Sequence, residues 1–82
     1  MKELQNWEID CNDYYLNFVD GSWAITLVQQ VNGYSIMVHS QLYELNKSLN
    51  IIDCSKIDYS LEEAKLKVKL LIDKVNKFGS FI

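Results

Sequence analysis

Apolar and polar residues alternate along the first half of the chain in four segments: residues 7–11, 14–19, 22–31 and 34–43. Alternation with a period of two is typical of strands that bury one face. The segments are separated by Asn12-Asp13, Asp20-Gly21 and Asn32-Gly33. Dipeptides of this kind join antiparallel strands into tight hairpins. The pattern therefore predicts a four-stranded antiparallel β-meander.

The three predicted turns place the apolar residues of all four strands on one face. They set Trp7 opposite Phe18, Phe18 opposite Trp23, Leu16 opposite Ile25, Leu27 opposite Val38 and Trp23 opposite Leu42. A slip of one residue would move every side chain to the other face, so the agreement of three turns favours this register. The opposite face should meet water or a partner. Its residues would be Glu8, Asp10, Tyr15, Asn17, Ala24, Thr26, Val28, Gln30, Ser35, Met37, His39 and Gln41.

Residues 60–78 predict a helix with a marked start and end. Ser60 and Glu63 form a capping box, and Gly79 follows the last turn. One apolar stripe would pack on the sheet, formed by Leu61, Ala64, Val68, Leu71, Ile72, Val75 and Phe78. We therefore expect an α+β fold in a single domain, residues 1–82, with one C-terminal helix on the apolar face of the sheet. Residues 49–52 could add a fifth strand or belong to a packed loop.

Leu66 and Leu70 lie outside the apolar stripe, on the far side of the predicted helix. Their burial would contribute roughly 3 to 6 kcal/mol, which can start an interface. Residues 44–59 or the tail residues Phe81 and Ile82 could cover them. The alternative is a contact with a partner, including a homodimer through Leu66 and Leu70.

Composition narrows the class of partner. The chain has 82 residues, a net charge of −3, eight basic residues and an isoelectric point near 4.9. Because all eight basic residues are lysine, and residues 1–41 carry five acids against one lysine, the composition argues against a nucleic-acid-binding protein. We see no signal peptide and no apolar run long enough for a membrane span, so we expect a cytoplasmic globular protein without a membrane partner.

The chain offers no pattern of metal or cofactor ligands. Cys11 and Cys54 do not form a CxxC motif, and His39, the single histidine, is distant from both in sequence. We therefore expect no metal and no cofactor. Reduced, buried thiols are the expected state, although a disulfide between the two cysteines is left open.

Catalysis is not expected from the predicted outer face. The register brings Asp10, Tyr15, Thr26 and His39 into one row, which combines an acid, hydroxyl groups and an imidazole. An enzyme needs such groups in a concave, dry pocket, and an open sheet face does not provide one. We interpret His39 as a surface residue and the protein as non-enzymatic.

The acids of the first hairpin are the strongest candidate for binding. Glu8 and Asp10 point to the same side about 6.8 Å apart along the strand, with Asp13 nearby. This spacing is similar to that of successive backbone phosphates, so an acidic edge could imitate nucleic acid to a basic groove. The candidate partner-binding residues are Glu8, Asp10, Asp13, Tyr15, His39, Leu66 and Leu70.

Two resemblances bear on function. The meander followed by a helix that starts Tyr-Ser-Leu-Glu-Glu-Ala (59–64) resembles the βββα arm-binding domain of phage integrases, but Glu8, Asp10, Thr26 and Gln30 stand where that domain has basic strand residues. In size and acidity the chain is similar to small phage-encoded inhibitors of host defence, of which anti-CRISPR proteins are the best-known group. That resemblance implies a phage or mobile-element inhibitor of a nucleic-acid-handling complex. A homo-oligomeric accessory module and a βββα DNA-binding module are the alternatives.

Overall fold

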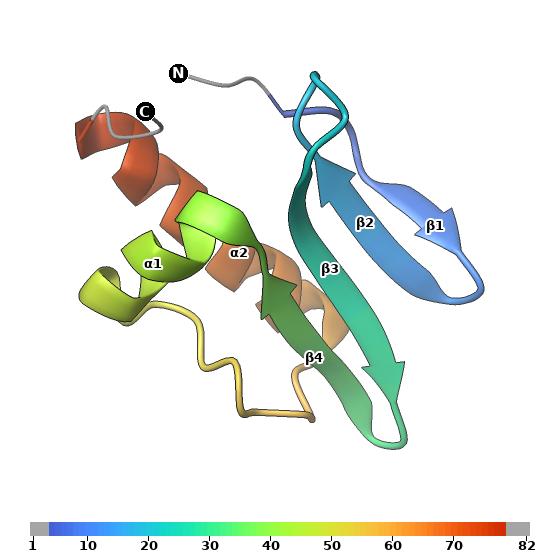
Figure 1. Ribbon diagram of the computed structural model, residues 1–82. Helices are drawn as coiled ribbons and strands as arrows, with labels where there is room; N and C mark the ends of the chain where they lie inside the picture. Colours follow the sequence, from blue (N-terminus) through green and yellow to red (C-terminus); the bar gives the residue numbers. More distant parts are fainter. Residues whose placement is uncertain (1–3, 79–82) are drawn as a thin grey trace.

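The computed structural model describes residues 4–78, which form a four-stranded antiparallel sheet and two helices (Figure 1). The strands are β1 (Glu8–Asp10), β2 (Asp13–Asn17), β3 (Trp23–Gln30) and β4 (Gly33–Val38), and they lie in the order β1-β2-β3-β4. The helices are α1 (Ser40–Leu49) and α2 (Leu61–Phe78). The predicted α+β class and the four-stranded meander are confirmed. The prediction of one helix is wrong.

Two of the hairpin turns lie one residue earlier than predicted. Residues 11 and 12 connect β1 to β2, so that Asp10 pairs with Asp13 and Ile9 with Tyr14. Cys11 and Asn12 both have positive φ, 51° and 69°, which is the signature of a type I′ turn. A turn at residues 12 and 13 would pair Ile9 with Leu16, whereas the observed turn pairs it with Tyr14. This shift of two positions leaves each side chain on its predicted face. Phe18 pairs with Leu4, not with Trp7.

The turn between β3 and β4 is displaced in the same way, for a reason that involves Gly33. Residues 31 and 32 make the turn, and Gln30 pairs with Gly33. A Cβ atom on Gly33 would lie 2.5 Å from the backbone oxygen of Tyr59, so this glycine is required in the strand, where a second segment approaches it. Leu27 consequently pairs with Ile36 and not with Val38.

The turn between β2 and β3 corrects the prediction for Trp23. The loop has three residues, 19–21, since Phe18 N–H donates to the backbone oxygen of Ser22 and Gly21 has a φ of 90°. A three-residue loop shifts the register by one, and a β-bulge at Ala24 shifts it back before the predicted pair Leu16–Ile25, which is confirmed. Trp23, predicted inside, is therefore 61% exposed, and Ala24, predicted outside, is fully buried.

Helix α1 replaces the second half of the predicted strand 34–43. β4 ends at Val38, and His39 occupies the N-cap position with extended backbone angles. Leu42, Leu45 and Leu49 then recur with helical spacing, so that Leu42 enters the core from a helix and not opposite Trp23. Asn50, in the left-handed conformation, ends α1 by donating its N–H to Asn46 O.

Residues 50–60 form a loop. Of the two possibilities for residues 49–52, the fifth strand is not formed, because Leu49 ends α1 and residues 50–52 belong to the loop. Asn46 holds the loop to α1, because its side chain donates to Ile52 O at 2.9 Å and accepts from Ile52 N–H at 2.8 Å. The loop reaches the sheet edge later, at Tyr59, which makes an isolated bridge with Tyr34. A single bridge closes part of the free edge of β4 without adding a strand.

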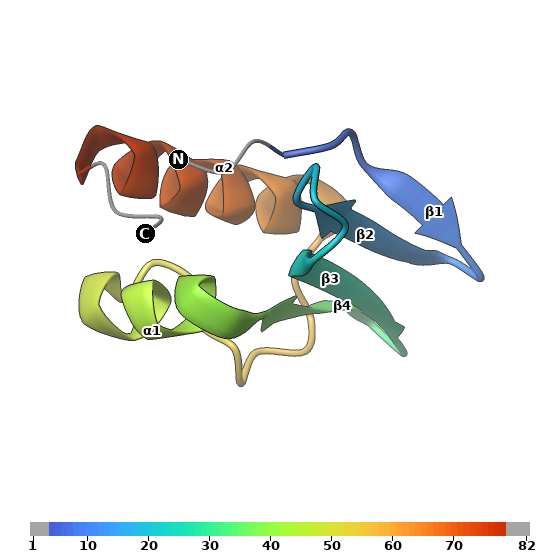
Figure 2. The same cartoon turned by 45° about the horizontal axis from the view of Figure 1, so that its top comes forward.

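Helix α2 confirms the prediction for residues 60–78. The Ser60 hydroxyl accepts a hydrogen bond from Glu63 N–H, which is the Ser60 half of the predicted capping box. The stripe packs against the sheet and α1, and its most buried members are Ala64, Val68, Leu71 and Val75. Gly79 lies outside the described residues. The two helices lie side by side and run in the same direction away from the sheet (Figure 2).

Candidate protein-binding surface

One face of the sheet packs against the helices, and the other, here called the outer face, has no described element over it. In the view of Figure 1, α2 begins behind β4, on the inner side. The observed pairs Glu8–Tyr15, Tyr15–Thr26 and Thr26–Met37 form one row across all four strands of the outer face. On one side of this row Trp23 pairs with Asn17, and on the other side Val28 pairs with Ser35. Alternation along the strands, interrupted at Ala24 by the β-bulge, places all of these side chains on the same side.

The centre of the outer face is apolar and aromatic. Trp23 is 61% exposed and Met37 is 50% exposed, while Tyr15 is half-buried between them and the edge strand. Thr26 is buried beneath these neighbours although no helix covers it. Large exposed apolar side chains on an uncovered sheet face are typical of surfaces that bind another protein.

His39 supports Trp23 from the adjacent strand end. The two rings meet edge to face with centroids 5.3 Å apart, and His39 Nε2 lies 3.0 Å from Thr26 Oγ1. Partial burial lowers the pKa of His39 below its ordinary value, because the charged imidazolium loses hydration. His39 is therefore half-buried and held in place, which corrects the expectation of a simple surface histidine.

Carboxylates border the outer face on the side of the first hairpin. Asp10 pairs directly with Asp13, and Glu8 lies on the same side of β1. Asp13 Oδ1 also accepts a hydrogen bond from Gln29 N–H at 2.9 Å, which fixes this carboxylate against β3. The acidic edge, defined as Glu8, Asp10 and Asp13, is thus held by the pairing of β1 with β2.

Two neighbouring groups report the negative potential of the acidic edge. The pKa of Cys11 is raised by a hydrogen bond to Asp10, by the Asp10 charge and, more weakly, by burial and the Asp13 charge. The pKa of Tyr15 is raised by desolvation first and then by the charges of Asp13 and Asp10. Both shifts have the sign that nearby carboxylates impose on a group that ionises to an anion.

The structure brings five of the seven candidate residues together and leaves two apart. Glu8, Asp10, Asp13, Tyr15 and His39 belong to the outer face or its border, whereas Leu66 and Leu70 lie on α2. The predicted row of Asp10, Tyr15, Thr26 and His39 is partly correct. Tyr15 and Thr26 are direct partners and His39 lies 3.0 Å from Thr26, but Asp10 pairs with Asp13 in the adjacent row.

Leu66 is 55% exposed and Leu70 is 43% exposed. The described part of residues 44–59 does not cover them, so one of the predicted explanations is wrong. The other, the tail at Phe81 and Ile82, lies outside the described residues.

Trp23, the most prominent side chain of the outer face, was predicted to be in the core. Only the length of the loop before it decides its side, and the sequence Asp20-Gly21-Ser22 is compatible with two-residue and three-residue loops. In the structure, Asp20 shows why the three-residue loop forms. Its carboxylate accepts from both Ser22 N–H and Ser22 Oγ, a local arrangement that favours the longer loop.

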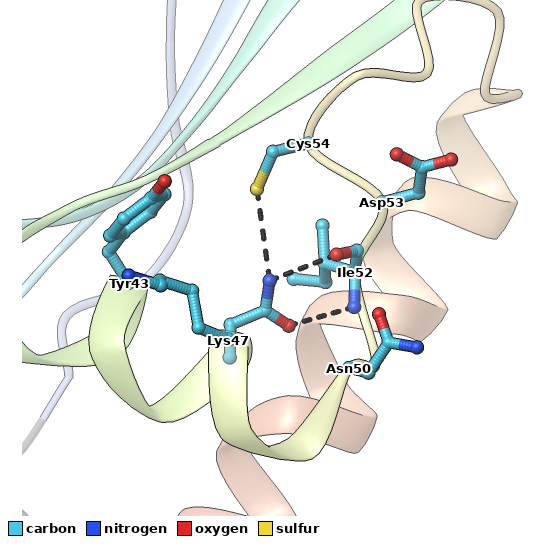
Figure 3. Close-up of a pocket in the computed structure, with 7 residues that line it drawn as sticks. Tyr43, Lys47, Asn50, Ile52, Asp53 and Cys54 are labelled. Carbon is cyan, nitrogen blue, oxygen red and sulfur yellow. Dashed lines mark hydrogen bonds between the residues drawn. The ribbon is translucent and has the colours of Figure 1, made fainter.

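A separate cavity of about 340 Å³ lies between the end of α1 and the following loop (Figure 3). Its lining residues are Tyr43, Asn46, Lys47, Asn50, Ile52, Asp53 and Cys54. The Asn46 amide is already engaged by Ile52 and lies 3.8 Å from the Cys54 sulfur. The Asn46 amide therefore holds the loop in place. The residues that line the cavity do not form a set of acid, base and nucleophile that suggests a reaction.

Both cysteines are free thiols and both are exposed, which corrects the expectation that they are buried. Within residues 4–78 no group of histidine, cysteine and carboxylate side chains is arranged to hold a metal ion. No helix in the same range is both long and apolar enough to cross a membrane.

Comparisons with protein-family models, curated proteins and solved structures found no match for this chain.

Proposed function

We propose that this chain is a non-enzymatic binding protein that occupies the surface of a basic protein partner through its outer face. One observation carries the proposal: Trp23 is displaced onto the uncovered face of the sheet by a three-residue loop and a β-bulge. A bulge that exposes a tryptophan and buries an alanine gives up core volume. Tryptophan is also among the residues that contribute most to binding when it enters a partner's pocket.

The arrangement around Trp23 fits the anatomy of a protein interface. Exposed Met37 and half-buried Tyr15 extend the apolar centre along the same face, and His39 fixes the orientation of the indole ring. A preorganised aromatic anchor loses little conformational entropy when it binds. The acidic edge supplies a charged rim on one side of this centre.

Charge complementarity defines the partner. The acidic edge offers carboxylates and no described lysine lies in the strands β1 to β4, so a lysine-rich or arginine-rich surface is the complement. An arginine of the partner can also stack on the exposed indole of Trp23, while other basic residues of the partner contact the carboxylates of the acidic edge. Such basic surfaces are typical of proteins that bind nucleic acid, and we propose a nucleic-acid-handling host complex as the target, in the manner of anti-CRISPR inhibitors.

The test is capture from a host lysate with three matched baits, the wild type, Trp23→Ala and Glu8→Lys. We expect the wild type to retain a protein with a basic nucleic-acid-binding surface. Duplex DNA added in excess should release the partner from the bait, because the DNA and the outer face compete for the same basic surface of the partner. Both variants should lose most of the retained protein, since one removes the anchor and the other reverses a rim charge.

Glu62→Lys on α2 is the control, because it makes the same charge change away from the outer face. This variant should retain the partner as the wild type does. If Trp23→Ala and Glu8→Lys keep the partner, or if DNA does not compete, then the outer face is not the inhibitory surface that we propose.

A further inference from the structure

The two edges of the sheet differ in what lies beside them. The edge at β4 is partly closed, because Tyr34 N–H donates to Tyr59 O at 2.8 Å and Tyr59 N–H donates to Tyr34 O at 3.1 Å. β1 ends the sheet on the other side, and no element within residues 4–78 pairs with its outer edge. Figure 1 shows β1 at the margin of the molecule, with no other described element beyond it.

The backbone of Ile9 points outward from this edge. The pair that flanks a two-residue turn, here Asp10 with Asp13, exchanges hydrogen bonds, and such pairs alternate along the strands with pairs that do not. Ile9 forms the next pair, with Tyr14, so its N–H and C=O are turned away from β2. An outward N–H and C=O on one residue are the groups to which an added strand can bond.

The side chains of β1 give this edge two chemically different sides. Glu8 and Asp10 project to the outer face, and Ile9, which is 66% exposed, projects to the inner face. The ammonium of Lys65, from α2, lies 4.8 Å from the centre of the Tyr14 ring, on the opposite side of the sheet from the carboxylates. An incoming strand would therefore meet negative charge on its outer side and an apolar surface beside a lysine on its inner side.

The carboxylates disfavour a second copy of β1 as the occupant. Two antiparallel copies paired at Ile9 would set Glu8 of each copy directly opposite Asp10 of the other, and like charges in that position are destabilising. No described lysine within residues 4–22 would offset them. A strand with lysine or arginine at those two positions meets opposite charges instead.

We infer that β1 receives an extended segment of the basic partner, paired antiparallel to it, with basic residues opposite Glu8 and Asp10 and an apolar residue opposite Ile9. The inference rests on the proposed function, because it describes how the same partner continues past the outer face. Main-chain hydrogen bonds to Ile9 supply the pairing, and alternation of charge supplies the specificity. Since β1 has three residues, this pairing adds to the contacts of the outer face.

NMR titration of the isotopically labelled full chain with three short peptides tests this pairing. The first is Lys-Val-Lys-Val-Lys, the second is the same peptide with both valine nitrogens methylated, and the third has the same composition in blocks, Val-Val-Lys-Lys-Lys. The alternating peptide should move the Ile9 amide proton downfield and slow its exchange with solvent. The methylated and block peptides should bind about three- to tenfold more weakly, because they lose a main-chain hydrogen bond or the matched alternation.

The outcomes separate this inference from the proposed function. Equal binding of the three peptides, or an Ile9 amide whose exchange stays unchanged, overturns the inference, because charge alone would then explain binding. Trp23→Ala should respond as the wild type does at Ile9, since the edge does not include the indole. Protection of Ile9 without capture of a basic protein from the lysate would contradict the proposed function and leave the strand-binding property of β1 intact.

Discussion

Thr26 Oγ1 lies 3.0 Å from His39 Nε2, joining the buried centre of β3 to the residue that starts α1. The same imidazole contacts the indole ring of Trp23. This contact links three features that the sequence places far apart: the β-bulge before Thr26, the end of β4 and the exposed aromatic anchor.

The burial of His39 predicts that the fold loses stability as the pH falls below neutrality. Partial burial holds the pKa of His39 below its ordinary value of 6.5 in the folded chain. As the pH falls through that value the unfolded chain binds more protons than the folded chain, so the free energy of unfolding decreases. Urea denaturation between about pH 7.5 and about pH 5.5 should show this loss. In His39→Gln the loss should be smaller, and an equal slope in both proteins would contradict the assignment.

The bulge predicts opposite effects for two adjacent residues. Trp23→Ala should reduce the free energy of unfolding by less than about 1.5 kcal/mol, since the indole is largely exposed and loses mainly its edge contact with His39. Ala24→Leu should reduce it by about 1 to 3 kcal/mol, because a larger side chain is forced into a filled site. Chemical denaturation measures both. If Trp23 were in the core, its truncation would cost about 3 to 5 kcal/mol instead.

The link between Asn46 and Ile52 predicts a large cost for a small polar change. Asn46→Ala should lower the free energy of unfolding by about 2 to 4 kcal/mol, because it leaves the buried N–H and C=O of Ile52 without their partner. Asn76→Ala, in an exposed position of α2, is the control and should change stability little. Similar stability of the two variants would show that Asn46 does not hold the loop.

Periodicity determines which segments are strands and which face each residue takes, whereas loop length determines the register that follows each turn. Alternation identified all four strands, and the turns at Asn12 and Asn32 were each misplaced by one residue, which moves the pairing by two and preserves the faces. The loop between β2 and β3 was one residue longer than predicted, which put Trp23 on the outer face and Ala24 in the core. The β-bulge then restored the predicted register. Single-sequence patterns do not distinguish these loops, because Asp-Gly occurs in both kinds.

Helix α1 was missed because its first turn continues the alternation of β4. Val38 and Leu42 are apolar and are separated by polar residues, which fits a strand as well as a helix over so short a segment. The helical signal appears only when Leu45 and Leu49 are included. The capping residues of α2, in contrast, identified that helix correctly. Strand alternation placed Glu8 and Asp10 on the outer face, and Asp13, predicted in the turn, begins β2 beside them. The exposed position of Trp23 required the observed bulge.

The outer face can be tested most directly by two-dimensional NMR of the isotopically labelled chain during titration with a short arginine-rich peptide. We predict salt-sensitive shifts at the acidic edge together with Tyr15, Trp23 and Met37. Trp23→Ala should remove the shifts around β3 and weaken binding. Shifts confined to α2, or an unchanged spectrum at peptide concentrations well above that of the protein, would contradict the assignment of the outer face as the binding surface.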